Sequence, residues 1–387
     1  MNRDLNDIRA MIASSCRREE RHLRELSLSI HREPELAFQE RRASGLIADY
    51  LEQRGWHVER GWLGLETALR ASVGEGRHIA LCAEYDALPE IGHGCGHHLI
   101  AAMSIGAAIA LGELASELGV RVSLFGTPAE EHGGGKIALL DRGAWDDVDV
   151  TGLVHPWAAP YDRSAEYVMM SAVARWSVEF RGRSSHAAAS PEEGVNASDA
   201  ATIASVAFGL LRQQTGPDVR FNANVVSVGT ESNIIPDRSH MTVEARSVSG
   251  VQLSALQSRL RACLEGAAIA TGCSLAVEDA EVPYRELRQD PILAQFWDAE
   301  LSHLGRDVRA EQHPGGSTDM GDVSHTVRTL HAYLAIPGDV VVSHTADFAQ
   351  HSASEVALET MILGAQVLAS TFAADALHHR TLQAGQS

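Results

Sequence analysis

The segment from Glu84 to His98 concentrates residues that bind transition metals. Cys95 and His97 are separated by one glycine, and two further imidazoles, His93 and His98, flank them. Glycine lets the backbone turn tightly, so the thiol and the imidazole can converge on one ion. A buried thiol beside a surface histidine is the alternative interpretation of Cys95 and His97. The additional histidines favour a metal site, and they leave open which side chains of the segment are ligands.

Two adjacent carboxylates, Glu130 and Glu131, follow an apolar run and a turn at 126–128. Such a pair often marks only a solvated helix start. A metal hydrolase, however, needs one carboxylate on the metal and another that takes a proton from water, and neighbouring side chains diverge enough to do both. His155 and His344 also lie next to strand-end or turn signals. Each alone is more often a core or turn histidine, but as members of this set both are predicted ligands.

A second group of polar residues is typical of substrate binding. His186 is either a surface histidine at a strand end or a donor to the oxyanion formed when water attacks a carbonyl. Asn233 and Arg246 are either turn and strand residues or groups that hold an amide or a carboxylate, the arginine through its two-pronged guanidinium. Ser317 lies in a loop that runs into a helix start, which is weak evidence for ligand contact.

Composition limits the class of protein. At 387 residues the chain is long enough for two domains. Its net charge of -19 argues against nucleic-acid binding, and its five cysteines do not form a disulfide framework. The sequence has no run of 18 apolar residues and no apolar leader, so we expect a cytoplasmic protein without a membrane partner. The chain is rich in arginine and has one lysine, Lys136, which we attribute to codon usage.

Strands and helices alternate in the first part of the sequence, which predicts an α/β fold with a mainly parallel sheet and the site at the strand ends. The predicted helices are 5–28, 35–53, 99–118 and 133–142, and the strands are 58–60, 68–73, 78–85, 121–126 and 152–155. Residues 173–285 follow the order strand-helix-strand-strand-helix-strand, typical of a small ferredoxin-like α+β domain. We therefore expect a catalytic domain at 1–172 and 286–387 and an inserted lid domain at 173–285. The last helix is predicted at 354–373, and 378–387 as a frayed tail.

Motifs spread over nearly the whole chain resemble the M20 metallopeptidase family, especially the amidohydrolase branch with p-aminobenzoyl-glutamate hydrolase subunits and β-alanyl-lysine type dipeptidases. They are the segments 31–36, 84–89, 92–97, 126–131, 154–156, 185–188, 233–237, 316–321 and 344–345.

The resemblance implies a two-metal site and a lid domain that also forms a homodimer. By motif position, the metal ligands are Cys95, His97, Glu131, His155 and His344. Glu130 matches the general base, His186 the histidine that reaches the neighbouring subunit's site, and Asp86 a carboxylate that orients a ligand. His98 departs from the family, which usually has Asp or Asn there, and this leaves the substrate open.

We therefore expect an amidohydrolase that uses metal-activated water to cleave the amide bond of an N-acyl or N-aroyl amino acid or a dipeptide. Its cofactors would be two divalent cations, zinc or manganese, with cobalt as a further fit. Its partners would be the small-molecule amide and a second copy of the chain. One alternative is a metal-dependent deaminase acting on an aromatic amine, and another is a binding homologue without activity.

Overall fold

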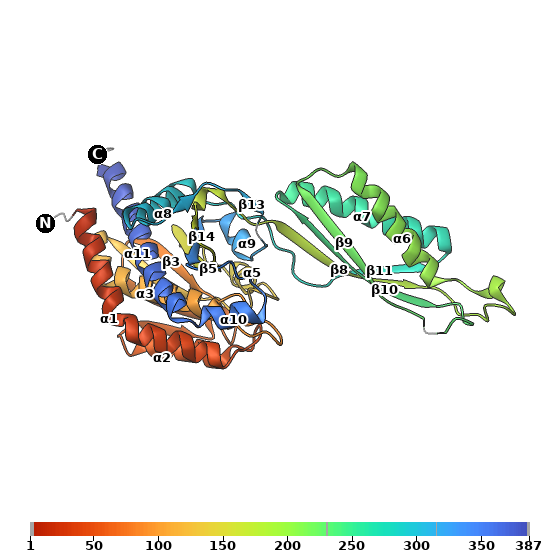
Figure 1. Ribbon diagram of the computed structural model, residues 1–387, viewed down its shortest axis with the longest axis horizontal. Coiled ribbons are helices and arrows are strands. Elements are labelled where there is room, and N and C mark those ends of the chain that lie inside the picture. The colour runs from red at the N-terminus through yellow and green to blue at the C-terminus, as the bar shows by residue number, and fades with distance from the viewer. Residues whose placement is uncertain (1–3, 230, 315, 385–387) are drawn as a thin grey trace. The chain divides into compact units, whose positions relative to one another are not determined.

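The computed structural model describes residues 4–229, 231–314 and 316–384, which form two compact units (Figure 1). Unit 1 comprises Met1–Met169, Arg288–Pro314 and Asp322–Ser387, and unit 2 comprises Met170–Leu287 and Gly315–Gly321. The predicted lid range, 173–285, falls inside the first segment of unit 2. The sequence assigned the segment around residue 318 to the catalytic domain, and this was wrong because the chain briefly returns to unit 2.

Unit 1 is built on a six-stranded sheet with the order β1-β2-β4-β3-β5-β14. The four strands β4, β3, β5 and β14 run parallel, while β1 and β2 form an antiparallel edge. The expected α/β class with a mainly parallel sheet is thus confirmed. Nearly all of β3 is buried, as expected for a central parallel strand covered on both faces. The strand bounds are β1 His57–Arg60, β2 Leu69–Gly74, β3 Arg77–Ala83, β4 Val120–Gly126, β5 Val150–Ala158 and β14 Arg328–Ile336.

Three long helices of unit 1 pack against one another, namely α1 (Leu5–Arg32), α3 (His97–Glu113) and α11 (Glu355–Ala384) (Figure 1). Helix α11 is long and apolar enough to cross a membrane, but 72% of its most apolar window is buried in the protein, as in a core helix. It continues to Ala384, so the predicted tail from residue 378 was wrong over its described part. The other helices are α2 Arg41–Glu52, α4 Ala115–Leu118, α5 Gly135–Leu140, α8 Pro291–His303, α9 Met320–Ser324 and α10 Ala346–Ser352.

Short parallel strand pairs extend unit 1 after β5. Strand β6 (Asp162–Arg163) pairs with β12 (Val308–Arg309), and β7 (Val168–Met169) pairs with β13 (His313–Pro314).

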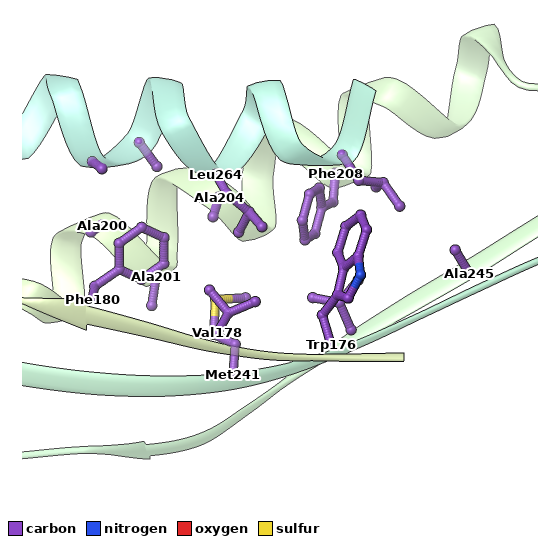
Figure 2. Close-up of a cluster of buried hydrophobic side chains, with 14 of the residues drawn as sticks. Trp176, Val178, Phe180, Ala200, Ala201, Ala204, Phe208, Met241, Ala245 and Leu264 are labelled. Carbon is purple, nitrogen blue, oxygen red and sulfur yellow. The ribbon is translucent and has the colours of Figure 1, made fainter. Parts of the chain in front are cut away.

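Unit 2 is an antiparallel sheet with the order β11-β8-β10-β9, covered on one face by two helices. Its elements follow the predicted order, and Figure 2 shows Trp176, Val178 and Phe180 of β8 pointing toward Phe208 and Leu264 of the helices. Strand β9 forms one edge of the sheet. The bounds are β8 Ala172–Arg181, α6 Ala197–Leu211, β9 Val219–Val228, β10 Arg238–Ser247, α7 Gly250–Thr271 and β11 Ser274–Asp279.

Candidate active site

The start of α3 fixes the imidazole of His97. Gly96, the residue before the helix, has φ 78, and a Cβ there would lie 2.8 Å from Cγ of Pro156, so only glycine fits. His97 Nδ1 lies 2.9 Å from Oδ1 of Asp86, which follows β3. Burial opposes protonation of this ring, but the Asp86 carboxylate outweighs it and raises the pKa of His97 well above its usual value. The predicted orienting contact of Asp86 is present, and it directs Nε2 away from Asp86.

The thiol of Cys95 lies between two histidines from distant parts of the chain. Its Sγ is 3.3 Å from Nε2 of His155 and 3.4 Å from Nε2 of His344. His155 Nδ1 donates to the carbonyl of Pro156 at 2.8 Å, which leaves Nε2 facing the thiol. His155 was predicted to end its strand, but β5 continues to Ala158 because residues 155–158 pair with β14. His344 has φ 63, and its amide donates to the Gly94 carbonyl at 2.8 Å, which fixes it against the Cys95 loop.

Glu130 and Glu131 approach the same point from the loop after β4. Glu131 Oε1 and Glu130 Oε2 lie 3.7 and 3.8 Å from Nε2 of His97, and Glu131 Oε2 lies 3.5 Å from Nε2 of His344. The residue before them, Ala129, has φ 61, an unusual value for a residue with a side chain. Its amide donates to Oε1 of the buried Glu40 at 2.9 Å, which helps to hold this strained turn.

These side chains form groups whose ligand atoms lie within 4.8 Å of one another: Cys95, His97 and His155; Cys95, Glu131 and His344; and Glu84, His97 and Glu130. His97 Nε2 and Glu131 Oε1 are buried and have no hydrogen-bond partner among the described residues. Unpartnered buried ligand atoms are costly unless a cation meets them, so the residues fit a metal centre.

The electrostatics of the site also fit a cation. Burial lowers the pKa of His155 to about 3, so this imidazole is neutral, as a metal ligand must be. His97, whose pKa is raised beside Asp86, would release its Nε2 proton when it binds an ion. Burial and the neighbouring Glu131 raise the pKa of Cys95 well above its usual value. A bound cation is what would stabilise the thiolate in these surroundings.

Sequence reasoning missed a buried ion pair beside this centre. The ammonium of Lys136 lies 2.6 Å from Oε1 of Glu84, and the two side chains are 0% and 1% exposed. Glu84 Oε2 faces His97 Nε2 at 3.7 Å. Burial opposes ionisation of Glu84, but Lys136 outweighs it and lowers the pKa of the carboxyl. The sequence did contain one sign of this pair: the single lysine of the chain directly follows three glycines and lies close to the predicted base.

The substrate-binding candidates of unit 2 form two pairs. His186 is exposed, its Nδ1 accepts from the amides of Ala188 and Ala189, and the amide of Ala187 donates to the Asn233 carbonyl. With Nδ1 as acceptor, Nε2 of His186 carries the proton and is the donor that an oxyanion requires.

The second pair lies at the other end of the same sheet. Arg246 bonds to Ser317 at 3.3 Å, and its Nε donates to Glu244 at 2.7 Å, so its charge is already offset. Arg246 stands opposite Val173 on β8, whereas His186 follows Arg181 at the far end of that strand. Eight residues of β-strand span about 26 Å. One chain therefore cannot bring both pairs to the same small substrate.

His98 is committed to packing between helices. Its Nδ1 lies 2.8 Å from the Ser27 hydroxyl and its Nε2 lies 3.1 Å from the Ser352 hydroxyl. Both ring nitrogens thus bond to α1 and α10. The departure at this position is accounted for by these contacts, and neither of them is to a predicted ligand.

Comparisons with known proteins agree with this geometry. Residues 170–271 match the family model described as peptidase dimerisation domain. The chain is 36% identical over 366 residues to the Xaa-Arg dipeptidase of Mus musculus, covering 89% of this chain and 84% of that protein. It is 30% identical over 261 residues to one of the polypeptides of the p-aminobenzoyl-glutamate hydrolase of Escherichia coli (strain K12), covering 62% of this chain and 53% of that polypeptide.

A solved structure shares the fold. The Bacillus subtilis YXEP protein, described as a dinuclear metal binding peptidase from the M20 family, aligns with a TM-score of 0.72 at 22% identity, covering 92% of this chain and 98% of that one. The chain belongs to the M20 family of metallopeptidases. It is a hydrolase of the peptidase and amidohydrolase type, which confirms the class predicted from the motifs.

Proposed function

We propose that this protein cleaves the amide bond of an N-acyl or N-aroyl amino acid or of a dipeptide, with two divalent cations as cofactors. The observation that carries the proposal is the position of Cys95, whose thiol is common to two ligand groups. Zinc or manganese suits this mixture of thiolate, imidazole and carboxylate, and cobalt fits the same ligands. We also propose that it is cytoplasmic, with no nucleic-acid or membrane partner.

The residues around the ligands supply proton transfer and orientation. Bound cations would polarise the amide carbonyl and make water more acidic. Glu130 belongs to neither Cys95 group, and it lies next to both, so we assign to it the proton taken from the attacking water and returned to the leaving amine. Asp86 holds His97 in one tautomer through its 2.9 Å contact.

Relatives guide the choice of substrate. The relative with 36% identity is a dipeptidase named for an arginine in its substrate, and another acts on p-aminobenzoyl-glutamate, as its name states. Dipeptides that end in arginine are therefore the first substrates to test. The deaminase alternative predicts ammonia without a free amino-acid product, so analysis of the products distinguishes the two reactions.

The function can be tested by a charge-removing variant of the base. Glu130→Gln should abolish turnover and keep the metal content, measured by elemental analysis after reconstitution with zinc, manganese or cobalt. Glu75→Gln, at an exposed position of unit 1, serves as the control and should behave as wild type. Turnover of Glu130→Gln at the wild-type rate would show that another residue is the base.

We propose that the protein is a homodimer formed through unit 2. Its edge strand β9 and helix α6 expose apolar side chains, including Val206 at 58%, Leu210 at 69% and Val226 at 57%. An exposed ten-residue edge of this kind is a template for pairing with another chain, and exposed apolar side chains beside it are typical of an interaction surface. A dimer would also overcome the separation of the two polar pairs, because His186 of the partner subunit could contact a substrate held by Arg246 and Ser317, which lie about 26 Å along the sheet from His186 of the same chain.

Mixed dimers test the contribution of the partner. Subunits carrying His186→Ala and subunits carrying Glu130→Gln should each be inactive alone. After unfolding and refolding together, about a quarter of wild-type activity should return, because half of the dimers are mixed and each has one intact site. No recovery, with mixed dimers demonstrated by mass spectrometry, would mean that His186 acts within its own chain.

A further inference from the structure

An arginine is held on aromatic rings beside the candidate metal centre in unit 1. His155 and Trp157 alternate along β5 and therefore share one face of the sheet, and Tyr333 of β14 stands opposite His155 with ring centroids 5.1 Å apart. The guanidinium of Arg163 lies 3.7 Å from the ring centroid of Trp157 and 6.0 Å from that of Tyr333. Stacking on the indole face fixes the plane of the guanidinium and leaves its N–H edge for a ligand.

Arg163 differs from the neighbouring arginines, whose charges are offset by ion pairs with aspartates. Arg306 pairs with Asp162 at 2.6 Å, and Arg309 pairs with Asp307 at 2.9 Å. Among residues 4–229, 231–314 and 316–384, no carboxylate lies within ion-pair distance of Arg163. The groups that act on its charge from further away are Tyr333, Tyr161 and, as the one carboxylate, Glu311. Burial lowers the pKa of this guanidinium, so its surroundings favour an incoming anion.

We propose that Arg163 is the anion subsite of unit 1 and binds the carboxylate of the amino acid released from the substrate. This inference rests on the proposed amidase function. Lys136 is excluded from the role because it is fully buried and paired with Glu84. A carboxylate one residue beyond the scissile carbonyl lies about 4 Å along the chain, and a charge-assisted hydrogen bond adds about 3 Å. The Tyr333 ring lies 5.1 Å from the ring of His155 and 6.0 Å from the Arg163 guanidinium, so His155 and Arg163 are at most about 11 Å apart, a span that the substrate and a cation bound to His155 would fill together.

The test compares alanyl-arginine with its C-terminal amide. In the wild type the acid should be cleaved with a kcat/KM about ten- to hundredfold above that of the amide. Arg163→Gln should lower kcat/KM for the acid by this factor, mainly through a higher KM, and should leave kcat/KM for the C-terminal amide unchanged. Arg163→Lys should recover part of the lost kcat/KM for the acid. Arg309→Gln is the matched control, because Arg309 stacks on Tyr161 at 4.0 Å on the neighbouring strand but is paired with Asp307.

Binding measurements separate the subsite from the reaction. In the Glu130→Gln background, calorimetry of alanyl-arginine should show weaker binding when Arg163→Gln is added, with an unchanged melting temperature. If the wild type cleaves neither substrate, the proposed function is wrong, but the binding measurement still tests the subsite. Equal losses for acid and amide, or unchanged binding in the double variant, would overturn the assignment of Arg163.

Discussion

Replacing Lys136 by methionine tests the buried ion pair beside the metal centre. The pair is 2.6 Å long and its side chains are 0% and 1% exposed, so the variant leaves the Glu84 carboxylate buried without its counter-charge. Removing one partner of a buried pair costs about 3–5 kcal/mol, several times the cost at the surface. We expect Lys136→Met to lower the free energy of unfolding by about this amount, measured by denaturant titration of the chelated protein.

Two further variants show whether the loss of stability comes from the uncompensated charge of Glu84. Adding Glu84→Gln to Lys136→Met removes the uncompensated charge and should restore most of the loss. Arg21→Met breaks an exposed pair with Glu25, whose side chains are 82% and 61% exposed, and should cost less than about 0.5 kcal/mol. A loss below about 1 kcal/mol in Lys136→Met, or no recovery in the double variant, would refute the argument that this pair offsets buried charge.

Three other outcomes follow from the same geometry. Burial, with Asp86 adding to it, raises the pKa of Glu40 from 4.5 to about 7, so the folded state keeps a proton that the unfolded chain releases, and stability falls as the pH rises through that window. Glu40→Gln should remove this dependence, so that its unfolding free energy relative to wild type rises by about 3 kcal/mol between pH 4 and pH 8, and a flat difference would contradict the pKa. Cys95→Ser should reduce both metal equivalents in elemental analysis, whereas loss of one would show that the thiol is not shared. Leu210→Asp should yield monomers in light scattering, while Ile269→Asp, at an 82% exposed position of α7, should not.

The sequence predicted that the candidate ligands lie close together because parallel strands place their carboxyl ends along one edge of a sheet. Glu130 and Glu131 follow β4, and Cys95 follows β3, the strand beside it. The glycines around Cys95 and the motif spacing made these positions visible locally. His155 was predicted to end its strand, but it lies inside β5, so its residue type was a better guide to the site than the expected end of the strand.

The remaining features depend on contacts that no local pattern records. The hydrogen bond from Arg246 to Ser317 joins residues 71 positions apart, at the place where the chain returns to unit 2. The sequence has no periodic pattern whose interruption would have marked this return. Arg163 lies in a two-residue strand, too short to show alternation. The pairing of Lys136 with Glu84 could not be read from composition, where a single lysine in an arginine-rich chain suggested only codon usage.

The charges around His97 explain why a buried lysine lies at position 136. Four carboxylates and one thiol face this centre, namely Glu84, Asp86, Glu130, Glu131 and Cys95, and with the thiol ionised they carry five negative charges. Lys136 offsets one of them, and the two divalent cations of the proposed function would offset the remaining four. Burying charge without compensation is costly, so the centre as a whole approaches neutrality only when lysine and both cations are present. In a chain with a net charge of -19, the one lysine therefore stands where a fixed positive charge completes the balance that the metals begin.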